Sequence, residues 1–255
     1  MSNAVDMLPN KPASQGAVIE SHRAVAEVAA AVRVAQDNPR DTSRAVEQMR
    51  EVCGRLAVAE RAFYSVPNRG SGLSVHIARE LARIWGNADY GVRELARDDE
   101  TGESEMQAWA WDVETNTRST RSFIVPHAKS TKQGRKALVD LNDIYLNNQN
   151  VGARAVRECI FSILPGWLTS EAEQILKATL QKGDGASVEQ RREAAIEKFR
   201  DLNVTEQQMT DYIGRDKGHW SASDLANLTR AYMSITQDGI PAQDFFPEKP
   251  VDIPA

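Results

Sequence analysis

The sequence contains few cysteines, few aromatic residues and no long apolar run. Two of its 255 residues are cysteine and 6% are aromatic. Cys53 and Cys159 stand far apart, which excludes a disulfide scaffold and is typical of a reducing cytoplasm. No window approaches the roughly 18 consecutive apolar residues of a membrane-spanning helix, and Met1 to Gly16 lacks the apolar core of a secretory signal. We therefore expect a cytoplasmic protein with no membrane partner.

The sequence also lacks the common catalytic and metal-binding motifs. It has no CxxC, no HExxH and no Walker-type GxxxxGK[ST]. His127 could act as a general base, but no local motif places a Ser or Cys nucleophile beside it. The acidic run from Asp98 to Glu105 could bind magnesium, although such runs are more often solvated turns. We predict no enzymatic activity, no metal and no cofactor.

Composition along the chain predicts one main domain and a small helical module. Met1–Gly16 is polar with two prolines and is expected to be a disordered arm, followed by a main core over 17–180. The Gly-containing segment 181–187 is the predicted linker. Helical patterns then fill 188–243, and the proline-rich segment 244–255 is expected to be a flexible tail.

The core alternates between helical and strand periodicities, which predicts an α+β fold. The helices are expected over 17–35, 44–62, 75–85, 147–164 and 170–180. Strands are expected over 90–97, 105–114 and 117–127, joined by short turns into an antiparallel three-stranded meander packed on the long helix over 147–164. The segments 63–72 and 128–136 are expected to be loops. In the second strand Trp109 and Trp111 share one face, where we expect burial rather than base stacking.

Charge is segregated along the chain. Between Glu80 and Glu114 ten acidic residues face three basic ones, whereas from Thr115 to Arg157 eight basic residues face two acidic ones. A field of one sign over a limited surface can attract a polyanion although the whole chain carries a net charge of -5. The predicted phosphate-binding residues are Arg118, Arg121, Lys129, Lys132, Arg135, Lys136, Arg154 and Arg157.

Aromatic rings lie within the same basic stretch. Phe123 and Tyr145 are candidates for stacking on bases, and basic groups mixed with flat rings are what sequence-tolerant single-strand binding needs. The alternative is that the charged side chains form an ordinary solvated surface and that the rings belong to the hydrophobic core.

Several segments, in order, resemble the phage single-strand annealing proteins of the RecT/Redβ/Erf group. They are FYSVPNRG at 63–70, ARELARIWGN at 78–87, AWAWD at 108–112 and ARAVRECI at 153–160. The resemblance covers about residues 63–180. It implies single-stranded DNA binding and ATP-independent annealing of complementary strands by a homo-oligomer, a ring or a helical filament, in phage recombination.

Two other functions remain open at this level. One is a metal-dependent nucleic-acid-processing enzyme that uses the acidic turn and His127. The other is an oligomeric scaffold that binds no nucleic acid. The C-terminal module has eight basic and twelve acidic residues from Gly185 to Ala255. It is therefore expected to bind a protein, such as a single-strand-binding protein or an exonuclease, rather than DNA.

Overall fold

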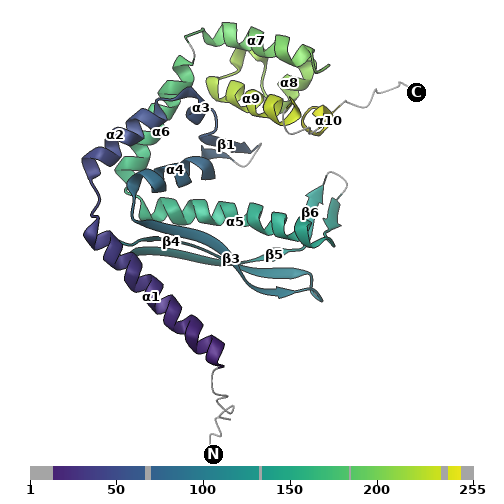
Figure 1. The fold of residues 1–255 in the computed structure, drawn as a ribbon. Helices are drawn as coiled ribbons and strands as arrows, with labels where there is room; N and C mark the ends of the chain where they lie inside the picture. The colour runs from purple at the N-terminus through teal and green to yellow at the C-terminus, as the bar shows by residue number, and fades with distance from the viewer. Residues whose placement is uncertain (1–13, 67–69, 132–133, 184, 237–240, 248–255) are drawn as a thin grey trace, which may run out of the picture.

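The structure, a computed structural model of the chain, describes residues 14–66, 70–131, 134–183, 185–236 and 241–247. It confirms the α+β fold, with a three-stranded antiparallel sheet packed on a long helix and helices from the N-terminal part of the chain beside them (Figure 1). A smaller helical module lies at the other end of the molecule from the sheet.

The meander consists of β3 (Ala88–Asp98), β4 (Glu103–Asp112) and β5 (Thr117–Pro126), with β4 in the middle. All of these bounds lie within two residues of the predicted strands. Its turns use left-handed backbone at Gly102, with φ 69°, and at Asn116, with φ 56°. Glycine and asparagine tolerate this conformation best, so the turn residues were readable from the sequence.

Helix α5 (Leu141–Ile163) covers one face of the sheet. On β4 it buries Met106, Ala108 and Ala110, whereas Trp109 and Trp111 lie on the opposite face. The helix begins six residues earlier than predicted because the Asp140 carboxylate caps it, accepting from the backbone N–H groups of Asn142 (2.8 Å) and Asp143 (3.2 Å).

Gly152 is where α5 approaches the sheet most tightly. A methyl group at this position would lie 2.7 Å from Val92 Cγ2. Alanine gains about 1 kcal/mol of helix propensity over glycine, but overpacking costs about 1–3 kcal/mol. We therefore expect Gly152→Ala to lower the free energy of unfolding by about 1 kcal/mol in urea denaturation.

Gly166→Ala is the matched control for that substitution, because nothing lies within 4 Å of a methyl group there. It should leave stability unchanged or raise it. Recovery of stability in Gly152→Ala/Val92→Ala would identify the contact, and a Gly152→Ala protein as stable as the parent would contradict it.

Four more helices complete the main core: α2 (Thr42–Cys53), α3 (Leu56–Ala59), α4 (Val75–Trp85) and α6 (Gly166–Lys182). The structure confirms the predicted bounds of α4 and its cap at Ser74. The Ser74 hydroxyl accepts a hydrogen bond from Ile77 N–H at 3.4 Å. The helix predicted over 44–62 is interrupted at Gly54. Cys53 and Cys159 are buried and unpaired, as expected, and burial raises the pKa of Cys53 to about 11.

Two small hairpins replace segments that were predicted to be loops. The first pairs β1 (Phe63–Val66) with β2 (Gly70–Leu73), and the second pairs β6 (Ala128–Thr131) with β7 (Gly134–Ala137). Glycine, lysine and alanine have low strand propensity, so composition did not predict β2, β6 or β7 as strands. The two hairpins are recognised from the antiparallel pairing of their strands in the structure.

The C-terminal module has its own core. It contains α7 (Val188–Arg200), α8 (Glu206–Ile213), a 3₁₀ turn η1 (Lys217–His219), α9 (Ala222–Thr236) and α10 (Ala242–Phe245). The predicted tail differs at its start, because Phe246 is buried against Phe199 with ring centroids 5.1 Å apart. Ala222 and Ala226 also join the main core, so the module is docked and its removal would uncover apolar surface.

Helix α1 (Gln15–Asp37) begins two residues before its predicted start and projects away from the rest of the molecule (Figure 1). Of the predicted arm, residues 1–16, only 14–16 lie in the described part of the chain.

Candidate nucleic-acid interface

The hairpin β6–β7 presents three of the predicted cations. Lys129 lies directly opposite Lys136, and Ser130 lies opposite Arg135. All three cationic residues are exposed, and none forms an ion pair with an acidic residue in the part of the chain that the structure describes. Like charges directly across an antiparallel pair destabilise it. An external anion would relieve this repulsion.

His127 fixes the base of that hairpin. Its backbone N–H donates to Gly102 O at 2.7 Å, and its own carbonyl accepts from Leu138 N–H at 2.8 Å. The hairpin is thereby joined to the turn between β3 and β4 and to the end of β5. This anchoring sets where the three cations lie.

Two further cations lie where β5 meets α5. Arg121 is opposite Ala108, so it is on the sheet face that α5 covers. Asn147 on α5 donates through Nδ2 to Pro126 O at 3.2 Å, and Arg154 follows it by two helical turns on the same side. Both arginines are exposed and have no described acidic partner. We call Arg121, Lys129, Arg135, Lys136 and Arg154 the basic seam.

The acidic residues nearest in sequence do not neutralise the seam. Asp140 uses its carboxylate to cap α5, as described above. Asp143 lies in the first turn of the same helix, where a negative charge complements the helix dipole.

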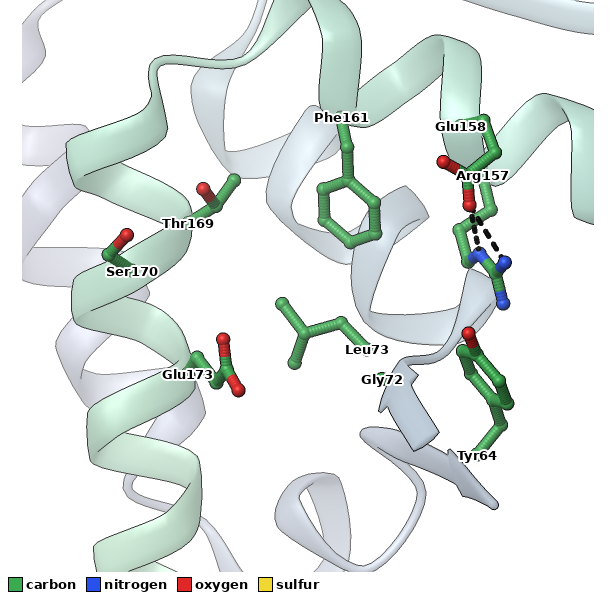
Figure 2. Close-up of a pocket in the computed structure, with 9 residues that line it drawn as sticks. All are labelled: Tyr64, Gly72, Leu73, Arg157, Glu158, Phe161, Thr169, Ser170 and Glu173. Carbon is green, nitrogen blue, oxygen red and sulfur yellow. Dashed lines mark hydrogen bonds and ion pairs between the residues drawn. The ribbon is translucent and has the colours of Figure 1, made fainter. Parts of the chain in front are cut away.

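The structure separates Arg118 and Arg157 from the seam. Arg118 is on the outer face of the sheet, 3.9 Å above the ring of Trp111. Arg157 bonds to Glu158 Oε1 at 2.7 and 3.0 Å and lies 4.3 Å from the ring of Tyr64 (Figure 2). Both have partners within the chain. Lys132 lies outside the described residues.

The aromatic candidates have different environments. Tyr145 is 58% exposed in the first turns of α5, whereas Phe123 is half-buried and packs on the main core. Beside Tyr145 in the chain, Val139 is 88% and Leu141 65% exposed. We call Val139, Leu141 and Tyr145 the apolar patch. Sequence reasoning did not select Val139 or Leu141, because a single aliphatic residue carries no signal of exposure.

Trp111 is buried as expected and Trp109 is half-buried, but neither lies under α5. Trp109 Nε1 donates to Asp89 Oδ2 at 2.8 Å, and the Arg93 guanidinium lies 5.2 Å from its ring. Gly91, opposite Trp109, leaves room for the indole. The rings of Trp109 and Trp111 therefore already have contacts within the chain.

One group resembles a hydrolytic triad. Ser104 Oγ lies 2.9 Å from His127 Nε2, and Asp99 Oδ1 lies 4.0 Å from His127 Nδ1. However, Ser104 is completely buried and also accepts from Asn148 Nδ2 at 3.0 Å. A nucleophile must reach its substrate, so this group is a structural link between β4, α5 and the base of the β6–β7 hairpin.

The acidic turn after β3 is held by its own backbone. Asp98 Oδ1 accepts from the N–H groups of Thr101 (3.1 Å) and Glu100 (2.9 Å), and these bonds lower the pKa of Asp98. Among the described residues, no three His, Cys, Asp or Glu side chains are placed to bind a metal ion together.

A shallow cavity of about 270 Å³ lies between the β1–β2 hairpin, α5 and α6 (Figure 2). Leu73 and Phe161 line it together with Glu158 and Glu173, and its one cation, Arg157, is already paired. The cavity is therefore a poor site for a polyanion.

Comparison of the chain with protein-family models, with curated proteins and with solved structures gives no match. The resemblance to annealing proteins accordingly stays a prediction. None of the described helices combines the length and the apolar character needed to cross a bilayer.

Proposed function

We propose that the protein binds single-stranded DNA along the basic seam and anneals complementary strands without ATP, acting as a homo-oligomer. One observation carries this proposal. Five exposed cations lie on three connected elements, β5, the β6–β7 hairpin and α5, and none has an acidic partner among the described residues. Such a surface gains free energy from phosphates, because each contact releases counterions.

The chemistry of the seam suits annealing. Lysine and arginine contact the phosphate backbone and leave the Watson–Crick edges exposed to a second strand. Annealing forms no covalent bond, so it needs charge neutralisation and strand alignment rather than a catalytic group. Many seams side by side in an oligomer would add avidity without tight binding by each subunit.

The apolar patch supplies a contact for bases at the end of the seam. Tyr145 offers a ring on which a base can stack, which contributes about 1–3 kcal/mol per base. Tyr145→Ser is therefore expected to weaken binding of an oligothymidylate about tenfold, and to change binding of an abasic strand of equal length little. Fluorescence anisotropy measures both. Equal losses on both strands would contradict a base contact.

Annealing itself is tested with two complementary oligonucleotides that carry a fluorophore and a quencher. With protein and no nucleotide, duplex formation should accelerate over the spontaneous rate. The double variant Arg121→Gln/Arg154→Gln should lose most of that acceleration. Arg44→Gln/Lys198→Gln, which removes two exposed cations elsewhere, should keep it. Failure of the parent protein to accelerate annealing at any salt concentration would refute the proposed function.

A further inference from the structure

We propose that a cavity between the C-terminal module and the main core binds a small phosphate monoester. The cavity has a volume of about 280 Å³ and adjoins the one in Figure 2, since Tyr64, Gly72 and Glu173 line both. Helix α9 forms its module side, and α3, β1 and α6 contribute its core side. No residue of the basic seam lines it, so the inference does not depend on DNA binding.

A row of hydrogen-bond donors on α9 lines the cavity. Ser223, Asn227 and Arg230 are four and three residues apart, which places them on one face of the helix. Asn227 Oδ1 accepts from Arg230 Nη2, which leaves the Asn227 Nδ2 group free to donate. Within the described part of the chain, no group accepts from that amide or bonds to the Ser223 hydroxyl.

Arg230 is a half-buried cation that forms no ion pair with any described carboxylate. Its Nη1 donates to Glu60 O at 2.5 Å, and its Nη2 donates to Asn227 Oδ1. Both acceptors are neutral oxygens, and a guanidinium has more N–H groups than these bonds use. Burial lowers the pKa of Arg230, although interactions with Tyr212 and Glu60 oppose this shift. An anion that enters the cavity would supply the missing counter-charge.

The acidic side chains of the cavity leave this role open. Glu173 pairs with Lys177 at 2.6 Å, and Asp224 pairs with Arg215 at 3.4 Å. Glu60 also lines the cavity and forms no ion pair among the described residues. Its carboxylate should repel an anion, so its removal is expected to strengthen binding.

The donor row and the opposite wall together indicate the class of ligand. Each of the three donor side chains can bond to a different terminal oxygen of a phosphate, whereas a carboxylate offers one oxygen fewer. Phe63, Leu180 and Ala226 supply apolar surface in the same cavity. Its volume is near the lower end for ligand pockets, about 300 Å³. A phosphate that carries one small apolar group therefore fits best.

Isothermal titration calorimetry of the full chain with phenyl phosphate, in a buffer free of phosphate and sulfate, tests the proposal. Phenyl phosphate should bind about tenfold more tightly than inorganic phosphate, because its ring is buried on the apolar wall. Ser223→Asp places a negative charge in the donor row and should weaken binding at least about tenfold. Glu60→Gln should tighten it about threefold.

Ser43→Asp is the matched control, because Ser43 and Ser223 are both exposed and each is the second residue of its helix. Aspartate is favourable in the first turn of a helix, so both variants should fold. Ser43→Asp should bind phenyl phosphate like the parent, and so should Arg121→Gln/Arg154→Gln, which alters only the basic seam.

Three results would overturn the proposal. They are no binding of phenyl phosphate at millimolar concentration, equal affinities for phenyl phosphate and inorganic phosphate, and equal binding by Ser223→Asp and Ser43→Asp. Loss of binding in the seam variant would assign the phosphate to the seam and would overturn it as well. Phenyl phosphate binding by a protein that fails to anneal DNA would support this site and refute only the proposed function.

Discussion

Replacing Lys129, Arg135 and Lys136 together with glutamine is expected to weaken binding of an unstructured single strand about 500-fold in 50 mM salt. The affinity for single strands varies with salt to the power of about -0.7 for each phosphate contact, so one contact contributes roughly eightfold at this concentration. Three contacts multiply to the figure above. Since all three side chains are exposed and lack described acidic partners, their loss should not disturb folding.

The matched control for the hairpin is Arg44→Gln/Lys182→Gln/Lys198→Gln, which removes three exposed cations from other elements. It changes net charge by the same amount and should weaken binding less than tenfold. If the two triple variants bind equally well, attraction depends on net charge alone and the hairpin has no special role. Circular dichroism confirms that each variant is folded.

The second large effect is on stability, and it concerns Arg40. Its guanidinium is buried, donates to Asp112 Oδ1 at 2.8 Å and to Trp85 O at 2.7 Å, and lies 4.3 Å from the Trp85 ring. Arg40→Ala leaves the Asp112 carboxylate buried without its counter-charge. Breaking such a pair costs about 3–5 kcal/mol, which urea denaturation at pH 7 should show as a lower midpoint.

The same pair gives stability a dependence on pH. Burial alone would raise the pKa of Asp112, but the hydrogen bond and the charge of Arg40 outweigh it, so the pKa is lowered. A carboxylate with a lowered pKa stabilises the fold above its unfolded pKa of about 3.9, and this stability is lost as the pH falls through the folded pKa. The parent protein should therefore lose stability below about pH 4.

Asp112→Asn is the control for the pH effect. It removes the titrating group, so its smaller stability should fall less steeply over the same acid range. Arg40→Ala with the stability of the parent at pH 7 would contradict the account of this pair. An equally steep acid loss in Asp112→Asn would assign the loss to other carboxylates.

The sequence predicted those elements whose signals are local. The bounds of α4 followed from the Ser74 cap and from Gly86 after its last turn, and the three long strands followed from alternation and from Gly102 and Asn116 in their turns. The start of α5 was missed because four asparagines in its first half weaken helix propensity. The Asp140 cap and contact with the sheet compensate for them.

Which face of a strand is covered cannot be read from alternation alone. The alternation of Met106, Ala108 and Ala110 with Trp109 and Trp111 was predicted correctly, and the larger rings suggested the core side. The structure places Met106, Ala108 and Ala110 under α5. At Gly152 this helix lies so close to the sheet that there is no room for indole rings between them. Tertiary packing decided this point.

Charge predicted the residues of the candidate site, and the fold separates some of these residues from the others. Arg118 and Arg121 are three residues apart in sequence, and the two-residue period of a strand sends them to opposite faces of the sheet. Arg154 and Arg157 share one helix, but only Arg157 has Glu158 and Tyr64 as partners. The β6–β7 hairpin could not be predicted from the sequence, because it is defined by the pairing of Lys129 with Lys136 in the structure.

The most direct test of the basic seam is the salt dependence of oligothymidylate binding by the full chain, measured by anisotropy between 50 and 300 mM salt. Five phosphate contacts predict a log–log slope of about -3.5, and each seam cation replaced by glutamine should reduce its magnitude by roughly 0.7. A slope near zero, or a slope that stays the same when Arg121, Arg154 and the three hairpin cations are replaced, would contradict the account.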